Sequence, residues 1–409
     1  MNTNQKQSIL HNWTQLIFNF YGTTPAEKTE EFFMNAACQA TGLSDWGDES
    51  FREPLRILLE SYKKDAKLNH IGWFMIHQKL TQILCSRLLI RDTLKRNPEI
   101  LRKKIEKPLF IISQPRTGTT LLQRLLGQDP FNRSLLCWEG LFPAPPPDPE
   151  THDIDPRIAE TKKILEIQHK IMPEFQIQHS MHATKPEECI FLLEKSLVFH
   201  GFHIVNNLPT YYEWLNKQDL TPTYRYHRQQ LQILQWHFPN QRWILKAPIH
   251  LHAIEALTTV YPDAYIVQTH RDPCKVIPSS CSLLTSFHAP TTDDLNLLAS
   301  FASVCLNNME DRVKRIFKLW DSFDPARLFD IHYKKLTQDP IGTVRGIYKH
   351  FGFEFTNEFE QRMKKYMDEN PKNKHGVHHY SLEQFGLNKK MINRKFAKYC
   401  ERFNIPQEG

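Results

Sequence analysis

The chain has 409 residues, of which 40% are hydrophobic, 24% charged and 11% aromatic, a composition that excludes disordered, collagen-like and disulfide-scaffold proteins. Lys and Arg exceed Asp and Glu by 52 to 45, and an excess of 7 on so long a chain favours small anionic ligands over a nucleic-acid-binding stripe. Only 14 glycines accompany 26 prolines, so a glycine at a tight turn is conspicuous.

Eight cysteines are scattered along the chain without a CxxC pair, a pattern typical of reduced thiols in a cytosol. The N-terminus lacks an apolar signal core, and no stretch approaches the ~20 apolar residues that a membrane span requires. We therefore expect a cytoplasmic protein with no membrane span and no nucleic-acid partner. The sequence indicates no oligomeric state.

Residues 1–105 have the pattern of a helical region. Apolar residues recur three and four positions apart over 9–17 and over 55–62, and the segment 71–94 continues this spacing. The pattern changes at Pro108, where the apolar run LFII is followed by SQPRTGTT and then by LLQRLLGQ at helical spacing. This succession predicts a strand, a loop and a helix.

Residues 106–409 alternate between strand-like and helix-like segments, which is typical of an α/β fold with a central parallel sheet and ligands at the carboxyl ends of its strands. Helical patterns over about 150–240, including 186–199, predict an insertion into this domain. The further predicted strands are 243–245, 264–269 and 328–332.

The joint between the first strand and its helix, Ser113–Thr120, has the features of a phosphate-binding loop. Gly118 lets the backbone approach an anion, the helix that follows favours negative charge at its start, and Arg116 adds a guanidinium. This is not a Walker A loop, because the first Gly of GxxxxGK[ST] is missing and Thr119 stands where that motif has Lys. A helix N-cap with an incidental Arg is the alternative interpretation.

A second basic position follows the strand YIVQTH. Arg271 stands at its end, Asp272 is the expected N-cap of the next helix, and Ser279 lies two turns into that helix. A guanidinium matches phosphate oxygens, so Arg271 predicts a second phosphate site, with a surface pair to Asp272 as the alternative. The strand does not end in a magnesium-binding Asp, which disfavours metal-dependent nucleotide chemistry, and we expect no metal site.

These motifs resemble those of the sulfotransferases that use 3′-phosphoadenosine 5′-phosphosulfate (PAPS). PRTGTT is similar to the 5′-phosphosulfate loop of that family, and Arg271 with Ser279 matches the pair that holds the 3′-phosphate. The stretches TGLSDWGDESFREPL, CWE with its proline-rich loop, KPEEC, LKAPIHLHAIEAL and HHYSLEQFGL resemble a bacterial-type branch of large sulfotransferases. The resemblance covers most of residues 40–402 and implies a three-layer P-loop-like α/β fold.

The resemblance also implies the reaction and the roles of single residues. Arg116 corresponds to the residue that neutralises the leaving 5′-phosphate, and Lys246 matches a Lys that contacts the transferring sulfonate. The reaction implied is in-line transfer of a sulfuryl group from PAPS to a hydroxyl or amine of a small molecule, lipid or glycan. The other donor-binding positions of the loop are Thr117, Gly118, Thr119 and Thr120.

The acceptor hydroxyl requires a general base within hydrogen-bond reach. Glu139 is the first candidate, since it resembles, with a two-residue insertion, the catalytic Glu of the tyrosylprotein branch. The cytosolic branch has a His two residues after the Lys, where this chain has Pro248, so the shifted His250 is a second candidate. Glu187 and Glu188 are candidates for contact with the acceptor, but we favour their interpretation as acids that complement the dipole of a helix.

Two other functions compete with this interpretation. A P-loop-like kinase or nucleotide hydrolase would need magnesium-dependent ATP turnover, which the missing Walker features disfavour. A nucleotide-binding protein without catalysis would fit the absence of the cytosolic-branch His. The presence of Arg116, Lys246 and Glu139 argues instead for an enzyme.

Overall fold

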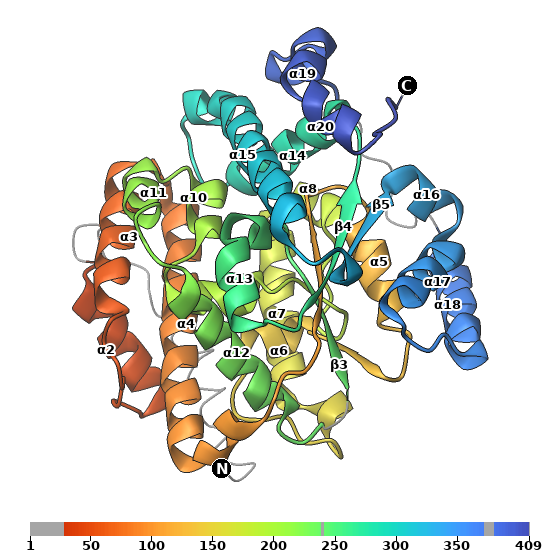
Figure 1. The fold of residues 1–409 in the computed structure, drawn as a ribbon. Helices are drawn as coiled ribbons and strands as arrows, with labels where there is room; N and C mark the ends of the chain where they lie inside the picture. The colour runs from red at the N-terminus through yellow and green to blue at the C-terminus, as the bar shows by residue number, and fades with distance from the viewer. Residues whose placement is uncertain (1–27, 239–240, 372–379, 409) are drawn as a thin grey trace.

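The fold is built on one parallel sheet that lies among the helices of the chain (Figure 1). The structure, a computed structural model, describes residues 28–238, 241–371 and 380–408. The strands follow the order β2-β3-β1-β4-β5, and each neighbouring pair is parallel. Their bounds are β1 (Leu109–Ser113), β2 (Asn132–Ser134), β3 (Arg242–Lys246), β4 (Tyr265–His270) and β5 (Leu328–His332).

Strand β1 lies at the centre of the sheet because its sequence, LFIIS, can be buried on both faces. All five of its residues are buried, and Leu109 pairs with Ile244 of β3 on one side and with Tyr265 of β4 on the other. A strand covered on both faces has a continuous apolar run instead of an alternating one. The carboxyl ends of β1, β3 and β4 therefore lie side by side, and so do the loops that follow them.

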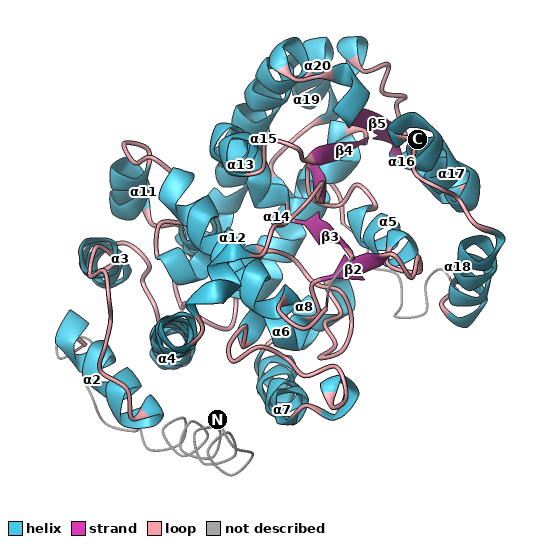
Figure 2. Cartoon of the chain, turned by 60° about the horizontal axis from the view of Figure 1, so that its bottom comes forward, coloured by secondary structure: helices cyan, strands magenta, loops and turns pink. Residues whose placement is uncertain are grey.

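Helices cover both faces of the sheet (Figure 2). Leu109 and Ile111 pack in one buried cluster with α5, α17 and α18, whereas Phe110 and Ile112 face the larger layer that contains α12 to α15. This three-layer arrangement confirms the predicted fold class. The bounds of the helices around the sheet are α5 (Thr119–Leu126), α13 (Ile254–Val260), α14 (Pro273–His288), α15 (Leu295–Ser322), α16 (Tyr333–Gln338), α17 (Pro340–Phe351), α18 (Asn357–Glu369), α19 (Lys389–Lys395) and α20 (Ala397–Arg402).

The helices before the sheet and those between β2 and β3 share a core with it. Phe33, Leu55 and Leu84 belong to the same buried cluster as Phe110 and Leu245 of the sheet. The helices before the sheet are α2 (Glu30–Thr41), α3 (Arg52–Lys64) and α4 (His70–Arg96). Those between β2 and β3 are α6 (Cys137–Leu141), α7 (Pro156–Ile171), α8 (Pro173–Gln178), α9 (Ile190–Leu193), α10 (His200–Asn206), α11 (Pro209–Leu215) and α12 (Thr221–Gln235).

The predicted helix over 186–199 is wrong at its beginning. The Glu187 N–H donates to the Leu135 carbonyl (2.8 Å), and the Cys189 N–H donates to the Lys246 carbonyl (2.9 Å). Because these N–H groups bond to residues at the ends of β2 and β3, this segment crosses the sheet edge before α9 begins. The two glutamates of KPEEC therefore lie at the carboxyl edge of the sheet and not on the first turn of a helix.

The structure also has a strand that the sequence did not predict, and one predicted helix cannot be compared with it. Strand β2 was not predicted, because Asn132–Ser134 has no apolar run and becomes a strand by pairing with Arg242–Ile244. The helical pattern over 9–17 lies outside the described residues. None of the described helices combines the length and the apolarity that a membrane span requires.

Candidate active site

The loop between β1 and α5 forms an anion-binding turn. Arg116 and Gly118 both have left-handed backbone conformations, with φ angles of 65° and 86°. A Cβ atom on Gly118 would lie 3.0 Å from Leu336 and 3.1 Å from Tyr333, so glycine is needed for space as well as for backbone conformation. The N–H groups in the first turn of α5 have no partner within the helix and can bind an anion.

The threonines of this loop differ in their positions. The Thr117 hydroxyl is buried, donates to the Gln114 carbonyl (2.7 Å) and lies 2.6 Å from the Thr269 hydroxyl of β4. Thr117 therefore fastens the loop to the sheet through its side chain. Thr119 is buried and Thr120 half-buried in the first turn of α5.

The structure brings Arg116, Ser279 and Arg271 together. Arg116 Nε donates to Ser279 Oγ (2.9 Å), and Arg271 Nη1 donates to the Arg116 carbonyl (2.9 Å). Burial, together with the nearby positive charge of Arg271, lowers the pKa of Arg116. Two guanidinium groups so close repel one another, and an anion between them would relieve that repulsion. The residues predicted for two phosphate groups thus lie at one place.

Arg271 already has a carboxylate partner in this structure. Its Nε lies 2.9 Å from Oε1 of Glu408, its Nη2 lies 3.0 Å from Oε2, and its guanidinium stacks 3.9 Å from the centre of the Tyr333 ring. The Glu408 N–H donates to Asp272 (2.8 Å) and anchors this segment. Burial lowers the pKa of Arg271, but the Glu408 carboxylate outweighs burial and raises it on balance.

Lys246 ends β3 and forms an ion pair that the sequence did not predict. Its ammonium group, with 2% of the side chain exposed, lies 2.7 Å from Oε1 of Glu188. The backbone carbonyl of Lys246 accepts the Cys189 N–H, so the same residue fixes the backbone beside its own partner. A lysine and a carboxylate thus meet at the sheet edge where β1 delivers the anion-binding loop.

Glu187 lies beside this pair and is buried. Its Oε2 is 3.4 Å from Nε2 of His179. Burial raises the pKa of Glu187, but His179 and Lys246 outweigh burial and lower it on balance. KPEEC therefore contributes two carboxylates to this edge of the sheet. Their signal in the sequence was present, but it was assigned to the dipole of a helix that begins later.

The structure places Glu139 in a different ion pair. Its Oε1 lies 2.5 Å from Nη2 of Arg133 and 3.2 Å from Nε2 of His152, and its Oε2 accepts the Leu136 N–H. Burial raises the pKa of Glu139, but Arg133, His152 and the Leu136 N–H together outweigh burial and lower it on balance. Both oxygens thus have protein partners, and Lys246 is not one of them.

His250 lies in the hydrophobic core. Its Nδ1 is 2.7 Å from the Tyr224 hydroxyl, and its ring meets the Phe110 ring edge-on at 5.2 Å. Burial, with a further contribution from His227, lowers the pKa of His250 well below its ordinary value. The structure therefore does not bring this second candidate base to Lys246.

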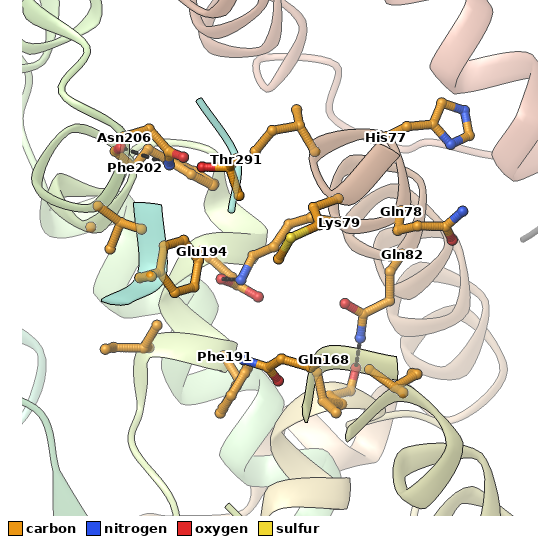
Figure 3. Close-up of a pocket in the computed structure, with 18 of the residues that line it drawn as sticks. His77, Gln78, Lys79, Gln82, Gln168, Phe191, Glu194, Phe202, Asn206 and Thr291 are labelled. Atoms are coloured by element: carbon orange, nitrogen blue, oxygen red, sulfur yellow. Dashed lines mark hydrogen bonds and ion pairs between the residues drawn. The ribbon is translucent and has the colours of Figure 1, made fainter. Parts of the chain in front are cut away.

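A cavity of about 340 Å³ is lined by residues of α4, α7, α8 and α10 (Figure 3) and by the two glutamates of KPEEC. Its walls are mainly apolar, and its volume is within the range of small-molecule sites. The described residues contain no group of three or more His, Cys, Asp or Glu side chains that could hold a metal ion. The apolar residues of the wall include Met75, Ile164, Leu165, Phe175, Phe191, Phe199, Phe202 and Phe287.

Comparisons with known proteins show which family this chain resembles. A family model described as the sulfotransferase family matches residues 108–357. The solved structure of sulfotransferase STF9 from Mycobacterium avium superposes with a TM-score of 0.85 and 30% identity, over 95% of this chain and 100% of that one. Sulfotransferase STF1 from Mycobacterium tuberculosis H37Rv has a TM-score of 0.80 and 33% identity, over 90% of this chain and 98% of that one.

A curated relative from Mycobacterium bovis, the omega-hydroxy-beta-dihydromenaquinone-9 sulfotransferase Stf3, is 25% identical over 290 residues, which are 68% of this chain and 71% of that one. The family model spans more than half of the chain, and it includes the anion-binding loop, Lys246 and Arg271. The protein therefore belongs to the sulfotransferase family, whose members transfer sulfuryl groups.

Proposed function

We propose that this sulfotransferase uses PAPS as its donor and a hydroxyl group on an apolar molecule as its acceptor. The observation that carries this proposal is the ion pair of Lys246 with Glu188, because Glu188 lines the cavity and Lys246 ends the strand that pairs with β1, which leads into the anion-binding loop. The donor has two separate anionic ends. Arg116 and the first turn of α5 fit the 5′-phosphosulfate, and Arg271 with Ser279 fits the 3′-phosphate.

In this proposal Glu188 is the general base, in place of Glu139 and His250. Glu188 accepts the proton of the acceptor hydroxyl while the new sulfur–oxygen bond forms. Lys246 donates hydrogen bonds to the sulfuryl oxygens as charge develops on them. The bond from sulfur to the 5′-phosphate oxygen breaks, and Arg116 with the N–H groups of α5 stabilises the electron pair that stays on the departing phosphate.

The acceptor class follows from the cavity wall. Glu187 and Glu188 line the cavity, and most of its wall is apolar. An acceptor with an apolar body would bury that body in the cavity and present its hydroxyl to Glu188. The Mycobacterium bovis relative is named for omega-hydroxy-beta-dihydromenaquinone-9, which is such a molecule.

The donor is tested by calorimetry with adenosine 3′,5′-bisphosphate in the absence of magnesium. We expect binding, and Arg271→Ala should weaken it by at least about 1.5 kcal/mol, the free energy of a charge-assisted hydrogen bond. Failure of the wild-type chain to bind this nucleotide would overturn the choice of donor. Magnesium-dependent ATP turnover would support a kinase or hydrolase instead.

The base is tested by transfer of labelled sulfate from PAPS to long-chain primary alcohols. Glu188→Gln should lower kcat by about 10²-fold or more, the usual effect of losing a general base. Glu139→Gln, which breaks the pair with Arg133, should lower the melting temperature and leave kcat of the folded enzyme within about threefold. The proposal fails if the losses of kcat are reversed between these two variants.

A further inference from the structure

One charged pair lies inside the apolar cavity. Lys79 Nζ of α4 is 2.6 Å from Oε2 of Glu194, whose side chain is only 1% exposed. Figure 3 shows the two side chains meeting in the middle of the cavity, among apolar neighbours that include Phe191 and Phe202. The 3-10 helix that Glu194 begins follows α9 directly.

The local sequence explains how the pair reaches the cavity. Gly72, Met75, Ile76, Lys79 and Gln82 all line it, and their spacing of three and four residues defines one face of α4. Lys79 is the charged residue of that face. Glu194 follows Glu188 by six residues, so one short segment of the chain contributes both carboxylates to the cavity wall.

The pair is not satisfied within the described part of the protein. Oε1 of Glu194 is buried and has no hydrogen-bond partner there. An ammonium group has three N–H donors, and the polar partner that the described residues give to Lys79 is Glu194, with the Phe191 ring 5.8 Å away. The Lys79 side chain is 36% exposed, but the Glu194 carboxylate is buried, and a buried carboxylate oxygen is unfavourable unless its hydrogen-bonding capacity is used. A polar group on a bound molecule would use it.

The charges and hydrogen-bonding capacity of Lys79 and Glu194 determine which polar group of a bound molecule can contact both of them. An anion would be repelled by Glu194, and a cation would be repelled by Lys79. An ether or carbonyl oxygen accepts from Lys79 but cannot donate to Glu194. A hydroxyl group both donates and accepts, so it can satisfy the two partners at once.

Building on the function proposed above, we propose that Lys79 and Glu194 form a second recognition point, and that the acceptor is an apolar molecule with two hydroxyl groups. One hydroxyl lies at Glu188 and receives the sulfuryl group. The other donates to Oε1 of Glu194 and accepts from Lys79. Because the two hydroxyls must reach Glu188 and the Lys79–Glu194 pair at the same time, the distance between these two points determines the length of acceptor that fits.

The experiment compares linear diols of increasing length with their monomethyl ethers, using PAPS as donor. Each ether retains one reactive hydroxyl and an acceptor oxygen at the other end, but it lacks the second O–H donor. For one range of lengths, kcat/KM of the diol should exceed that of its ether by about tenfold or more, well above the factor of two that two reactive ends provide. Glu194→Gln and Lys79→Met should each reduce this ratio to about two.

The matched control is Lys95→Met on the same helix. Lys95 pairs with Asp45 (2.6 Å) on the exposed side of α4, away from the cavity, so its loss should leave the ratio at the wild-type value. Binding of adenosine 3′,5′-bisphosphate reports whether each variant is folded. A wild-type ratio of about two at every length, or an unchanged ratio in both cavity variants, would overturn this inference.

The proposed function has a separate readout. If the wild-type chain neither binds adenosine 3′,5′-bisphosphate nor sulfates any alcohol, the proposed function has failed. If it binds the nucleotide and sulfates diols and ethers at equal rates per hydroxyl, only the second recognition point has failed.

Discussion

Glu408 is the carboxylate partner of Arg271 when no donor is bound. The carboxylate makes hydrogen bonds to two guanidinium nitrogens, at the position where we place the 3′-phosphate. Both side chains are partly exposed, at 15% and 24%, so solvent screens the pair and its contribution is about 1 kcal/mol at most. Donor binding therefore exchanges one anion on Arg271 for another.

Glu408→Gln should tighten the binding of adenosine 3′,5′-bisphosphate by about fivefold, which corresponds to about 1 kcal/mol. The reason is that the nucleotide no longer has to displace a carboxylate from Arg271. Calorimetry at fixed ionic strength measures the change. Glu401→Gln is the control, because it removes the same charge from an exposed position on α20. Equal tightening in both variants would indicate a general charge effect and contradict the specific role of Glu408.

At the scale of elements, the segment that crosses the ends of β2 and β3 shows where sequence reasoning fails. The acids of KPEEC look like the first turn of a helix, and that interpretation uses local information alone. The N–H groups of Glu187 and Cys189 bond instead to Leu135 and Lys246, which are distant in sequence. The pairing of Glu188 with Lys246 could not be predicted, because the position of Glu188 depends on these long-range hydrogen bonds.

The positions of Gly118, Lys246 and Arg271 in the fold have local causes. Gly118 is required by a turn that PRTGTT itself forms. Lys246 ends one short apolar strand and Arg271 follows another, and both strands pair with the apolar strand β1. Glu139 and His250 were chosen by similarity of position. The partners that hold them, Arg133 and Tyr224, become neighbours through tertiary packing, which no local pattern records.

Lys195, in the helix-rich segment after β2, makes the stability of the folded state depend on pH. Its buried amine donates to the Gly140 carbonyl (2.8 Å) and to the Phe191 carbonyl, which ties α6 to α9. Burial lowers its pKa from 10.5 to about 7, although Glu194 opposes the shift. Between these two values the unfolded chain binds a proton that the folded chain does not, so the lysine makes the folded state more stable as pH rises.

We therefore expect the free energy of unfolding of the wild type, relative to Lys195→Met, to increase from pH 7 to pH 9. The slope should be at most about 1.4 kcal/mol per pH unit. Urea denaturation of both proteins at each pH measures it. Lys63→Met, at an exposed position on α3, is the control and should run parallel to the wild type. A constant difference between wild type and Lys195→Met would mean that the amine does not titrate in this range.

At the scale of the whole molecule, the helices before the sheet are part of its core. Leu84 of α4 is fully buried in the cluster that contains Phe110 and Leu245. A cluster shared in this way predicts that the N-terminal helices and the sheet unfold together. The sequence predicted both parts, but it could not show that one apolar cluster joins them.

Leu84→Ala should therefore destabilise the entire chain by about 2–5 kcal/mol, the usual range for a buried leucine. Unfolding in urea, followed by circular dichroism and by loss of adenosine 3′,5′-bisphosphate binding, should give coincident curves for wild type and variant. An early loss of helical signal with nucleotide binding intact would instead show that the N-terminal helices unfold on their own.

Helix α8 contacts both the loop that carries Arg116 and the cavity. The carbonyl of Gln178, its last residue, accepts a hydrogen bond from Arg116 (2.9 Å), while Phe175 and His179 line the cavity. Any displacement of α8 by an acceptor would change the hydrogen bonds of Arg116, whose guanidinium we propose to bind the donor. The affinities for donor and acceptor are then thermodynamically linked, and the linkage must be reciprocal: whatever factor the acceptor applies to donor affinity, the donor applies to acceptor affinity.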